Sequence, residues 1–113
     1  MTGAFTINQH SVYALFDTGA TLSFVSSQVI TLCMLETHSV FPTLRVETPV
    51  GSTHFNQIAK DVKLTTGSQV LPADLLILPL EDFDIILSMD WLFRYQAEIN
   101  CVSRRITLQR PNQ

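Results

Sequence analysis

The sequence predicts one domain that is mostly β, with one or two short helices. Its 113 residues suit a single domain that buries a core of modest size. Most apolar residues fall in short runs of strand type, which end at clusters of turn-forming residues. Two segments, each with a serine suited to an N-cap before it, are interpreted as short helices. These observations together favour a β fold in which helices are minor elements.

The N-terminal part predicts a hairpin, a short strand and a helix. Residues 8–11 have the composition of a turn and join two strands into a hairpin. Ser26 and Ser27 are good N-caps for a helix of about two turns over residues 28–34. The predicted strands of this part cover residues 5–8, 12–16 and 22–25.

The rest of the chain predicts further strands and one more helix. Residues 48–51 have proline and glycine placed for a type I turn, which makes a second hairpin. A loop at 79–82 precedes a buried strand, after which Ser88 is the expected N-cap of a helix over 89–95. The predicted strands cover residues 40–47, 52–58, 62–65, 70–78, 84–87, 98–100 and 105–108.

Composition limits the partners of this chain. Apolar residues make up 46% of it and charged residues only 15%, so apolar surface remains to be covered. A homodimer is the simplest way to bury this apolar surface, although a partner domain would serve equally well. The net charge is -3 and no basic run is longer than Arg104-Arg105, which disfavours nucleic acid as the main ligand. No segment approaches the roughly 20 apolar residues of a membrane span, and the N-terminus lacks the features of a secretory signal. We therefore expect a cytoplasmic protein.

The cysteines and histidines do not predict a metal or cofactor site. Cys33 and Cys101 lack the close spacing of metal ligands, and we expect both to be reduced. His10, His38 and His54 lie far apart in predicted turn, loop and hairpin regions. Neither a Ser-His-Asp nor a Cys-His arrangement follows from their spacing.

One polar stretch interrupts the apolar pattern in an unusual place. The apolar strand at residues 12–16 stops at Asp17, and Thr18 and Gly19 follow at once. A charge at the tip of a buried strand is costly unless something requires it there. Glycine allows a sharp turn or the close approach of another backbone. From spacing alone, a polar Asx-turn and an active-site loop are equally good interpretations.

Two blocks of the sequence resemble a known family. Asp-Thr-Gly-Ala at 17–20 resembles the catalytic loop of aspartic proteases. Residues 14–26 as a whole resemble the retroviral-type (retropepsin-like) proteases of gypsy-class long-terminal-repeat retrotransposons. Residues 84–92 resemble their second signature, an aspartate, three apolar residues, glycine, a variable pair and tryptophan-leucine. The resemblance covers nearly the whole chain and implies a retropepsin-like closed β-barrel, one half of an acid protease, over residues 1–113.

The single Asp-Thr-Gly copy has a consequence for mechanism. Hydrolysis of a peptide bond by carboxylates needs two of them sharing one proton, and a two-fold homodimer supplies the second. The resemblance implies that Asp17 is the catalytic carboxylate on the dimer axis. It also implies that Thr18 hydrogen-bonds the opposite loop, Gly19 presents its N–H to the carboxylate and Ala20 fits a crowded position. No cofactor is implied.

The hairpin at about residues 46–58 matches the position of the family's flap, which closes over an extended polypeptide substrate. The expected substrate-binding residues are Pro49, Val50, Gly51 and Ser52. An ordinary exposed hairpin is the alternative. Because Gly51 is its only glycine and Pro49 lies beside it, this flap is expected to be stiffer than most.

The second block departs from the family pattern at one position. Ile86, Leu87 and Ser88 are expected to pack on the catalytic loop, and Ser88 stands where glycine is usual. Its extra atoms would cost roughly 1–3 kcal/mol in a tight site, unless the serine is accommodated as a helix N-cap. Leu22 replaces a histidine that many plant relatives carry. Asp84 and Asp90 are expected to be structural, like most carboxylates at a strand start or in a first helical turn.

Three hypotheses follow. The first is a homodimeric aspartic endopeptidase that processes a retrotransposon polyprotein, in the cytoplasm or within virus-like particles. The second is a weak or inactive protease-like fold that serves in dimerisation or peptide binding, motivated by Ser88. The third is an unrelated small β-barrel binding domain in which Asp-Thr-Gly is a coincidence.

Overall fold

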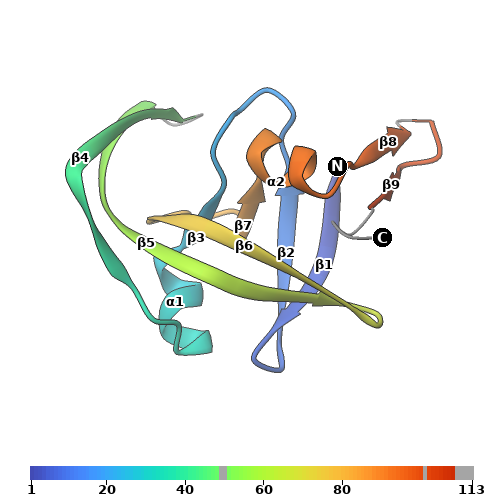
Figure 1. The fold of residues 1–113 in the computed structure, drawn as a ribbon, viewed down its shortest axis with the longest axis horizontal. Coiled ribbons are helices and arrows are strands. Elements are labelled where there is room, and N and C mark those ends of the chain that lie inside the picture. Colours follow the sequence, from blue (N-terminus) through green and yellow to red (C-terminus); the bar gives the residue numbers. More distant parts are fainter. Residues whose placement is uncertain (49–50, 101, 109–113) are drawn as a thin grey trace.

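The computed structural model describes residues 1–48, 51–100 and 102–108 (Figure 1). Seven strands of this described part form one sheet in the order β1-β2-β7-β3-β6-β5-β4, and β8 pairs only with β9. A further pairing of β1 with β5, at Thr6 and Thr65, closes six strands into a barrel and leaves β4 outside it. The prediction of a closed β-barrel with two short helices is confirmed. The elements are β1 Thr2–Ile7, β2 His10–Phe16, β3 Phe24–Ser26, α1 Ser27–Cys33, β4 His38–Thr48, β5 Gly51–Thr66, β6 Gln69–Leu78, β7 Ile85–Leu87, α2 Met89–Arg94, β8 Glu98–Asn100 and β9 Arg105–Thr107.

Two tight turns set the register of the long hairpins. The β1–β2 turn is shorter than predicted, because His10 already pairs with Ile7. Its central residues Asn8 and Gln9 have φ values of 49° and 72°, which match the twist of the flanking strands. The β5–β6 turn contains Gly67 with φ 58°, a conformation that glycine adopts without strain. The first turn lies within the predicted turn at residues 8–11, and the second lies between the predicted strands at 62–65 and 70–78.

The helix α1 begins at a serine cap, as predicted, and its bounds of Ser27–Cys33 lie one residue before the predicted 28–34. The Ser26 side chain is the N-cap and accepts a hydrogen bond from the Gln28 N–H at 3.2 Å. Met34 follows the last turn in the left-handed conformation, and its N–H bonds back to the helix. Val29 and Cys33 face the barrel core. The Asn8 side chain donates to the Cys33 carbonyl at 2.8 Å, which ties the β1–β2 turn to the end of this helix.

The barrel core comes from alternate positions of its strands. Its largest fully buried members are Ile7, Val12, Leu64, Leu71, Leu75, Ile85 and Leu87. At the end near α2 the core becomes aromatic. Trp91 lies against Phe5, Phe16 and Tyr95, with ring centroids 6.0, 6.2 and 5.0 Å away. This cluster connects α2 to the residue just before Asp17.

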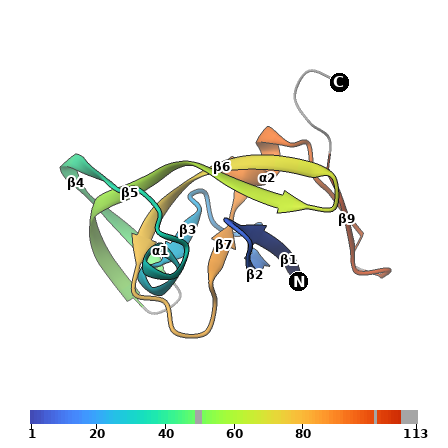
Figure 2. The same cartoon turned by 90° about the horizontal axis from the view of Figure 1, so that it is seen from below.

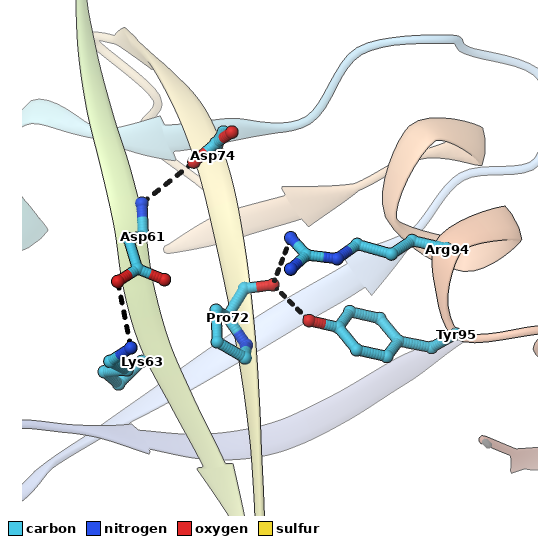
Figure 3. Close-up of polar contacts among 6 residues, drawn as sticks. All are labelled: Asp61, Lys63, Pro72, Asp74, Arg94 and Tyr95. Atoms are coloured by element: carbon cyan, nitrogen blue, oxygen red, sulfur yellow. Dashed lines mark hydrogen bonds and ion pairs between the residues drawn. The ribbon is translucent and has the colours of Figure 1, made fainter. Parts of the chain in front are cut away.

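One strand prediction was wrong. Residues 52–58 and 62–65 were predicted as two strands, but β5 runs without a break from Gly51 to Thr66. The pairing with β6 shifts register between Ala59 and Val62, where Asp61 has φ 53°. The Asp61 N–H donates to the Asp74 carboxylate at 2.8 Å, so this irregularity keeps its hydrogen bond (Figure 3). The gap between the two predicted strands is therefore a bulge within one strand.

The helix α2 is fastened to β6 by one carbonyl. Pro72 O accepts from the Tyr95 hydroxyl at 2.6 Å and from Arg94 Nη1 at 3.4 Å (Figure 3). The Arg94 guanidinium also lies 5.3 Å from the centre of the Tyr95 ring. Both side chains thus turn toward β6, which orients the whole helix.

The hairpin of β8 and β9 stands apart from the barrel sheet, as Figure 1 shows. Ile99 pairs with Ile106, and both are partly buried. The Ala97 N–H donates to the Leu92 carbonyl at 2.9 Å and connects this hairpin to the end of α2. Among the described helices none is long and apolar enough to cross a membrane.

Candidate active site

The sheet places Asp17 at the end of a strand in the middle of the barrel. β2 and β7 run parallel, and the last pair is Phe16 with Leu87. The Asp17 N–H continues this ladder by donating to the Leu87 carbonyl at 3.0 Å. Parallel strands finish at the same edge, so the chain leaves β2 at Asp17 directly beside the exit of β7 at Ser88. The two signature blocks are thereby brought together.

The carboxylate of Asp17 is held by its own loop. The Gly19 N–H donates to Asp17 Oδ1 at 2.9 Å. A Cβ atom at Gly19 would lie 3.3 Å from that oxygen, which explains why glycine suits the position. The Asp17 side chain is half-buried, Thr18 is exposed at the loop tip and Ala20 is half-buried. This geometry is an Asx-turn, and it also leaves a fixed carboxylate that is open to solvent.

The far side of the loop rests on the start of α2. The Met89 N–H donates to the Ala20 carbonyl at 3.0 Å, and the Asp90 N–H donates to the Thr21 carbonyl at 3.1 Å. The first N–H groups of a helix have no partner within the helix. These bonds therefore give partners both to the N–H groups of α2 and to the carbonyl groups of the loop. The loop that carries Asp17 is therefore fixed at both ends by the second block.

A polar network beneath the loop was not expected from the sequence. Asp90 accepts hydrogen bonds from the Ser23 hydroxyl, from the Ser23 N–H at 3.1 Å and from the Trp91 N–H at 2.7 Å. The Ser23 hydroxyl in turn accepts from the Ser88 N–H at 2.9 Å. Asp84 accepts from the Tyr13 N–H at 2.8 Å. Both aspartates are structural, as predicted, but the sequence gives no sign that Ser23 is the partner of Asp90.

Ser88 occupies the N-cap position of α2 without capping it. Its side chain makes no cap hydrogen bond, so the predicted capping role was wrong. The residue is fully buried, and among the described residues its hydroxyl has no hydrogen-bond partner. Its φ of -108° is accessible to any residue. Glycine is therefore not required here by backbone conformation, and the cost of serine lies in its buried hydroxyl.

An apolar wall adjoins the loop on the outer face of the barrel. Ile86 points away from the core that Ile85 and Leu87 enter. It packs with Phe24, Leu76 and Leu78, and four partly buried residues cover this cluster: Leu15, Leu22, Ile58 and Leu80. Leu22 belongs to the segment after Asp17, and Ile58 belongs to the β4–β5 hairpin. The wall thus lies between the carboxylate loop and the hairpin predicted as the flap.

The predicted flap is a real hairpin. β4 and β5 pair from His38 and Ile58 up to Thr48 and Gly51, and Ser52 pairs with Glu47. Pro49 and Val50 lie outside the described residues. In Figure 1 the end of β4 and the start of β5 lie at the same upper end of the molecule as the loop after β2. A substrate-binding role for its tip stays a prediction.

Comparison with known families agrees with this geometry. The family model described as retroviral aspartyl protease matches residues 1–113. The chain belongs to the retroviral aspartyl protease family. This membership overturns the hypothesis of an unrelated β-barrel with a chance Asp-Thr-Gly. A comparison with curated proteins finds no match.

Solved structures share the fold of this retroviral aspartyl protease family member. The retroviral protease-like domain of Ddi1 from Leishmania major is 22% identical, with a TM-score of 0.74 over 95% of this chain and 86% of that one. EIAV protease in complex with an inhibitor is 17% identical, with a TM-score of 0.69 over 88% and 91%. Simian foamy virus protease is 16% identical, with a TM-score of 0.57 over 88% and 100%. At these identities the similarity shows the retropepsin-like fold.

Gly3 lies close to the ring of the residue that precedes Asp17, a contact that was not predicted from the sequence. A Cβ atom there would lie 2.8 Å from the Phe16 ring. Gly3 pairs with Ala14 across the β1–β2 hairpin, so the ring of Phe16 lies over the β1 backbone just before Asp17. Gly3 lies within β1 but before the predicted strand of residues 5–8, so no pattern in the sequence marked this close approach.

Proposed function

We propose that this family member is an aspartic endopeptidase, active as a homodimer in which two Asp17 side chains form one site. The observation that carries the proposal is the single Asp17 carboxylate, fixed by the Gly19 N–H and open to solvent at the edge of the sheet. One chain contributes one such carboxylate. A two-fold axis beside the loop brings in the second carboxylate, because in an isologous contact the same surface of each subunit meets its counterpart on the other.

The chemistry follows from the pair. Two carboxylates about 3 Å apart cannot both ionise, so one keeps a proton at moderately acidic pH. The ionised Asp17 takes a proton from a water, which attacks the scissile carbonyl carbon. The protonated Asp17 of the other copy donates its proton to the carbonyl oxygen, forming a tetrahedral intermediate. The pair titrates as a unit. No metal ion or cofactor takes part in this sequence.

The residues around Asp17 have supporting roles in this proposal. Thr18 is exposed at the loop tip, where its hydroxyl is free to bond the loop of a second copy. Gly19 fixes the carboxylate, and Ala20 joins the loop to α2 through its carbonyl. Leu87 and Ile86 support the loop from below, one through its carbonyl and the other as part of the apolar wall.

The substrate is an extended polypeptide. It lies between the Asp17 loops and the β4–β5 hairpins, whose tip residues Pro49, Val50, Gly51 and Ser52 close over it through backbone bonds. The apolar wall takes apolar substrate side chains next to the cleaved bond. The resemblance to gypsy-class elements makes a retrotransposon polyprotein the proposed natural substrate, cleaved in the cytoplasm or within virus-like particles.

A weak or inactive protease-like module is the second candidate. The observation that favours it is the buried, unpartnered hydroxyl of Ser88 directly below the loop. Such a group destabilises the segment that positions Asp17. In this alternative the fold retains dimerisation or peptide binding and loses efficient cleavage.

Cleavage of a denatured protein at acidic pH separates the two candidates. The parent chain, Asp17→Asn and the parent with a statine-type inhibitor are incubated side by side. Cleavage that both the substitution and the inhibitor abolish supports the endopeptidase. Equal residual cleavage by parent and variant would refute it and favour the binding module.

A further inference from the structure

The alternation of side chains along β5 is interrupted at the base of the β4–β5 hairpin. Ala59, Val62 and Leu64 all enter the barrel core, although strict alternation would place Ala59 and Val62 on opposite faces of the strand. The bulge at Asp61 accommodates the extra residue between them, and Asp61 itself is exposed. The bulge therefore changes, by one residue, which side chains of β5 face inward on its two sides.

The direction of the side chains on the hairpin side of the bulge depends on this change. Ile58 turns away from the core and packs against the apolar wall, where it pairs with Leu76. Without the bulge, a strand that kept Val62 in the core would also point Ile58 into the core and would turn Ala59 toward the wall. The bulge is thus what gives the wall its contribution from the hairpin.

The hairpin has few other attachments to the sheet. β5 pairs with β6 only as far as Ile58 and Leu76, and among the described strands β4 pairs with β5 alone. Figures 1 and 2 show the hairpin projecting from one side of the barrel. The direction in which it projects is therefore set largely by the segment of β5 that contains the bulge.

Asp74 holds the backbone of the bulge. Asp61 has a φ of 53°, a left-handed conformation that aspartate adopts more readily than most residues but still at a cost. The Asp74 carboxylate accepts a hydrogen bond from the Asp61 N–H at 2.8 Å, and Lys63 Nζ lies 2.9 Å from Asp61 Oδ2 (Figure 3). The ion pair joins two exposed side chains and contributes little. The bond to Asp74 is different, because it gives a partner to a backbone N–H at the break in the β5–β6 pairing.

We infer that Asp74 is a positioning residue for substrate binding, since it fixes the bulge that directs the β4–β5 hairpin. This inference rests on the proposed function, in which the hairpin closes over an extended polypeptide. Without the Asp74 acceptor, the Asp61 N–H bonds to water and the base of the hairpin adopts several directions. A smaller fraction of the molecules then presents the hairpin to the substrate, so the apparent affinity falls in proportion. The chemical step at Asp17 is unchanged once a bound substrate has ordered the hairpin.

Two substitutions at Asp74 test the inference. Asp74→Ala removes the acceptor, whereas Asp74→Asn keeps one carbonyl oxygen for the Asp61 N–H. Lys63→Ala is the matched control, because it removes the neighbouring ion pair and leaves the bond to Asp74 in place. Peptide-cleavage kinetics at one fixed protein concentration give KM and kcat for the parent and the three variants. Hydrogen exchange measured by mass spectrometry reports the opening of β5, and circular dichroism checks folding.

We expect Asp74→Ala to raise KM by about fivefold while kcat changes by less than about twofold, with faster hydrogen exchange around the bulge. Asp74→Asn and Lys63→Ala should keep KM within about twofold of the parent value. A parent that cleaves peptide and an Asp74→Ala variant with the parent KM would overturn the inference and leave the proposed function standing. Cleavage by the parent that is no greater than that by Asp17→Asn would overturn both.

Discussion

Removal of the Ser88 hydroxyl should stabilise the protein. The sequence suggests an N-cap, and replacing a working serine cap with alanine typically costs ~1 kcal/mol. The structure predicts the opposite sign. Ser88 makes no cap bond, it is fully buried, and its hydroxyl has no partner among the described residues. A buried polar group without a partner costs about 1–3 kcal/mol, so Ser88→Ala should raise the free energy of unfolding by about that amount.

Three further substitutions test whether the buried hydroxyl is the cause of this effect. Ser88→Gly also removes the hydroxyl but should be about 0.5–1 kcal/mol less stable than Ser88→Ala, because glycine loses more backbone freedom on folding. Ser88→Thr keeps the hydroxyl and adds a methyl group, which should cost about 1–3 kcal/mol in this enclosed space. Ser26→Ala is the positive control, since the Ser26 hydroxyl does cap α1 and its loss should cost ~1 kcal/mol.

Urea denaturation at a fixed protein concentration measures all four variants, because dimerisation makes apparent stability concentration-dependent. The expected order of stability is alanine, glycine, serine and threonine at position 88. If Ser88→Ala is less stable than the parent while Ser26→Ala behaves as a cap loss, the Ser88 hydroxyl has a partner and the reasoning is refuted. A parallel gain in cleavage rate for Ser88→Gly would connect the buried hydroxyl beneath the loop to activity.

Three other changes test separate parts of the account. Gly19→Ala places a Cβ atom 3.3 Å from Asp17 Oδ1. It should lower kcat by about tenfold or more, while the free energy of unfolding changes by less than about 1 kcal/mol. Unchanged peptide-cleavage kinetics would contradict this expectation. Tyr95→Phe removes the 2.6 Å hydrogen bond to the Pro72 carbonyl and should lower the free energy of unfolding, measured in urea, by about 0.5–1.5 kcal/mol. An unchanged free energy of unfolding would show that this contact does not hold α2. Burial, with Asp84 adding to it, raises the pKa of the Cys33 thiol above its usual 9.0. The unfolded chain therefore loses this proton first as pH rises, so the contribution of Cys33 to stability is full below about pH 9 and is lost above it. The unfolding free energy of Cys33→Ala should fall less steeply between about pH 8 and pH 10, and parallel profiles would contradict the assignment.

Local chemistry made much of the fold predictable. Turn composition located the β1–β2 hairpin, and Ser26 located the start of α1. Asp17, Thr18 and Gly19 were marked by a carboxylate at the end of an apolar strand. These features depend on neighbours within a few residues, and such neighbours are visible in a sequence.

Features that depend on distant partners were not predictable. The bulge at Asp61 is stabilised by Asp74 on the next strand, so the sequence alone suggested two strands with a gap between them. The bond between Ser23 and Asp90 joins residues that the barrel brings together from opposite ends of the chain. Ser88 looked like a helix cap, because its local context resembles one. Its hydroxyl is instead enclosed by the contacts of the Asp17 loop, which only the tertiary structure shows.

Mixing of subunits tests most directly whether each chain supplies half of one active site. The parent chain is combined with a threefold excess of Asp17→Asn under conditions that allow exchange, and an equal mass of unrelated protein serves as the control. If both Asp17 side chains are needed, random pairing leaves about one quarter of the parent activity, because most parent chains are then in mixed dimers. Parent activity that is unaffected by the excess of Asp17→Asn, despite measured exchange, would contradict a shared carboxylate pair.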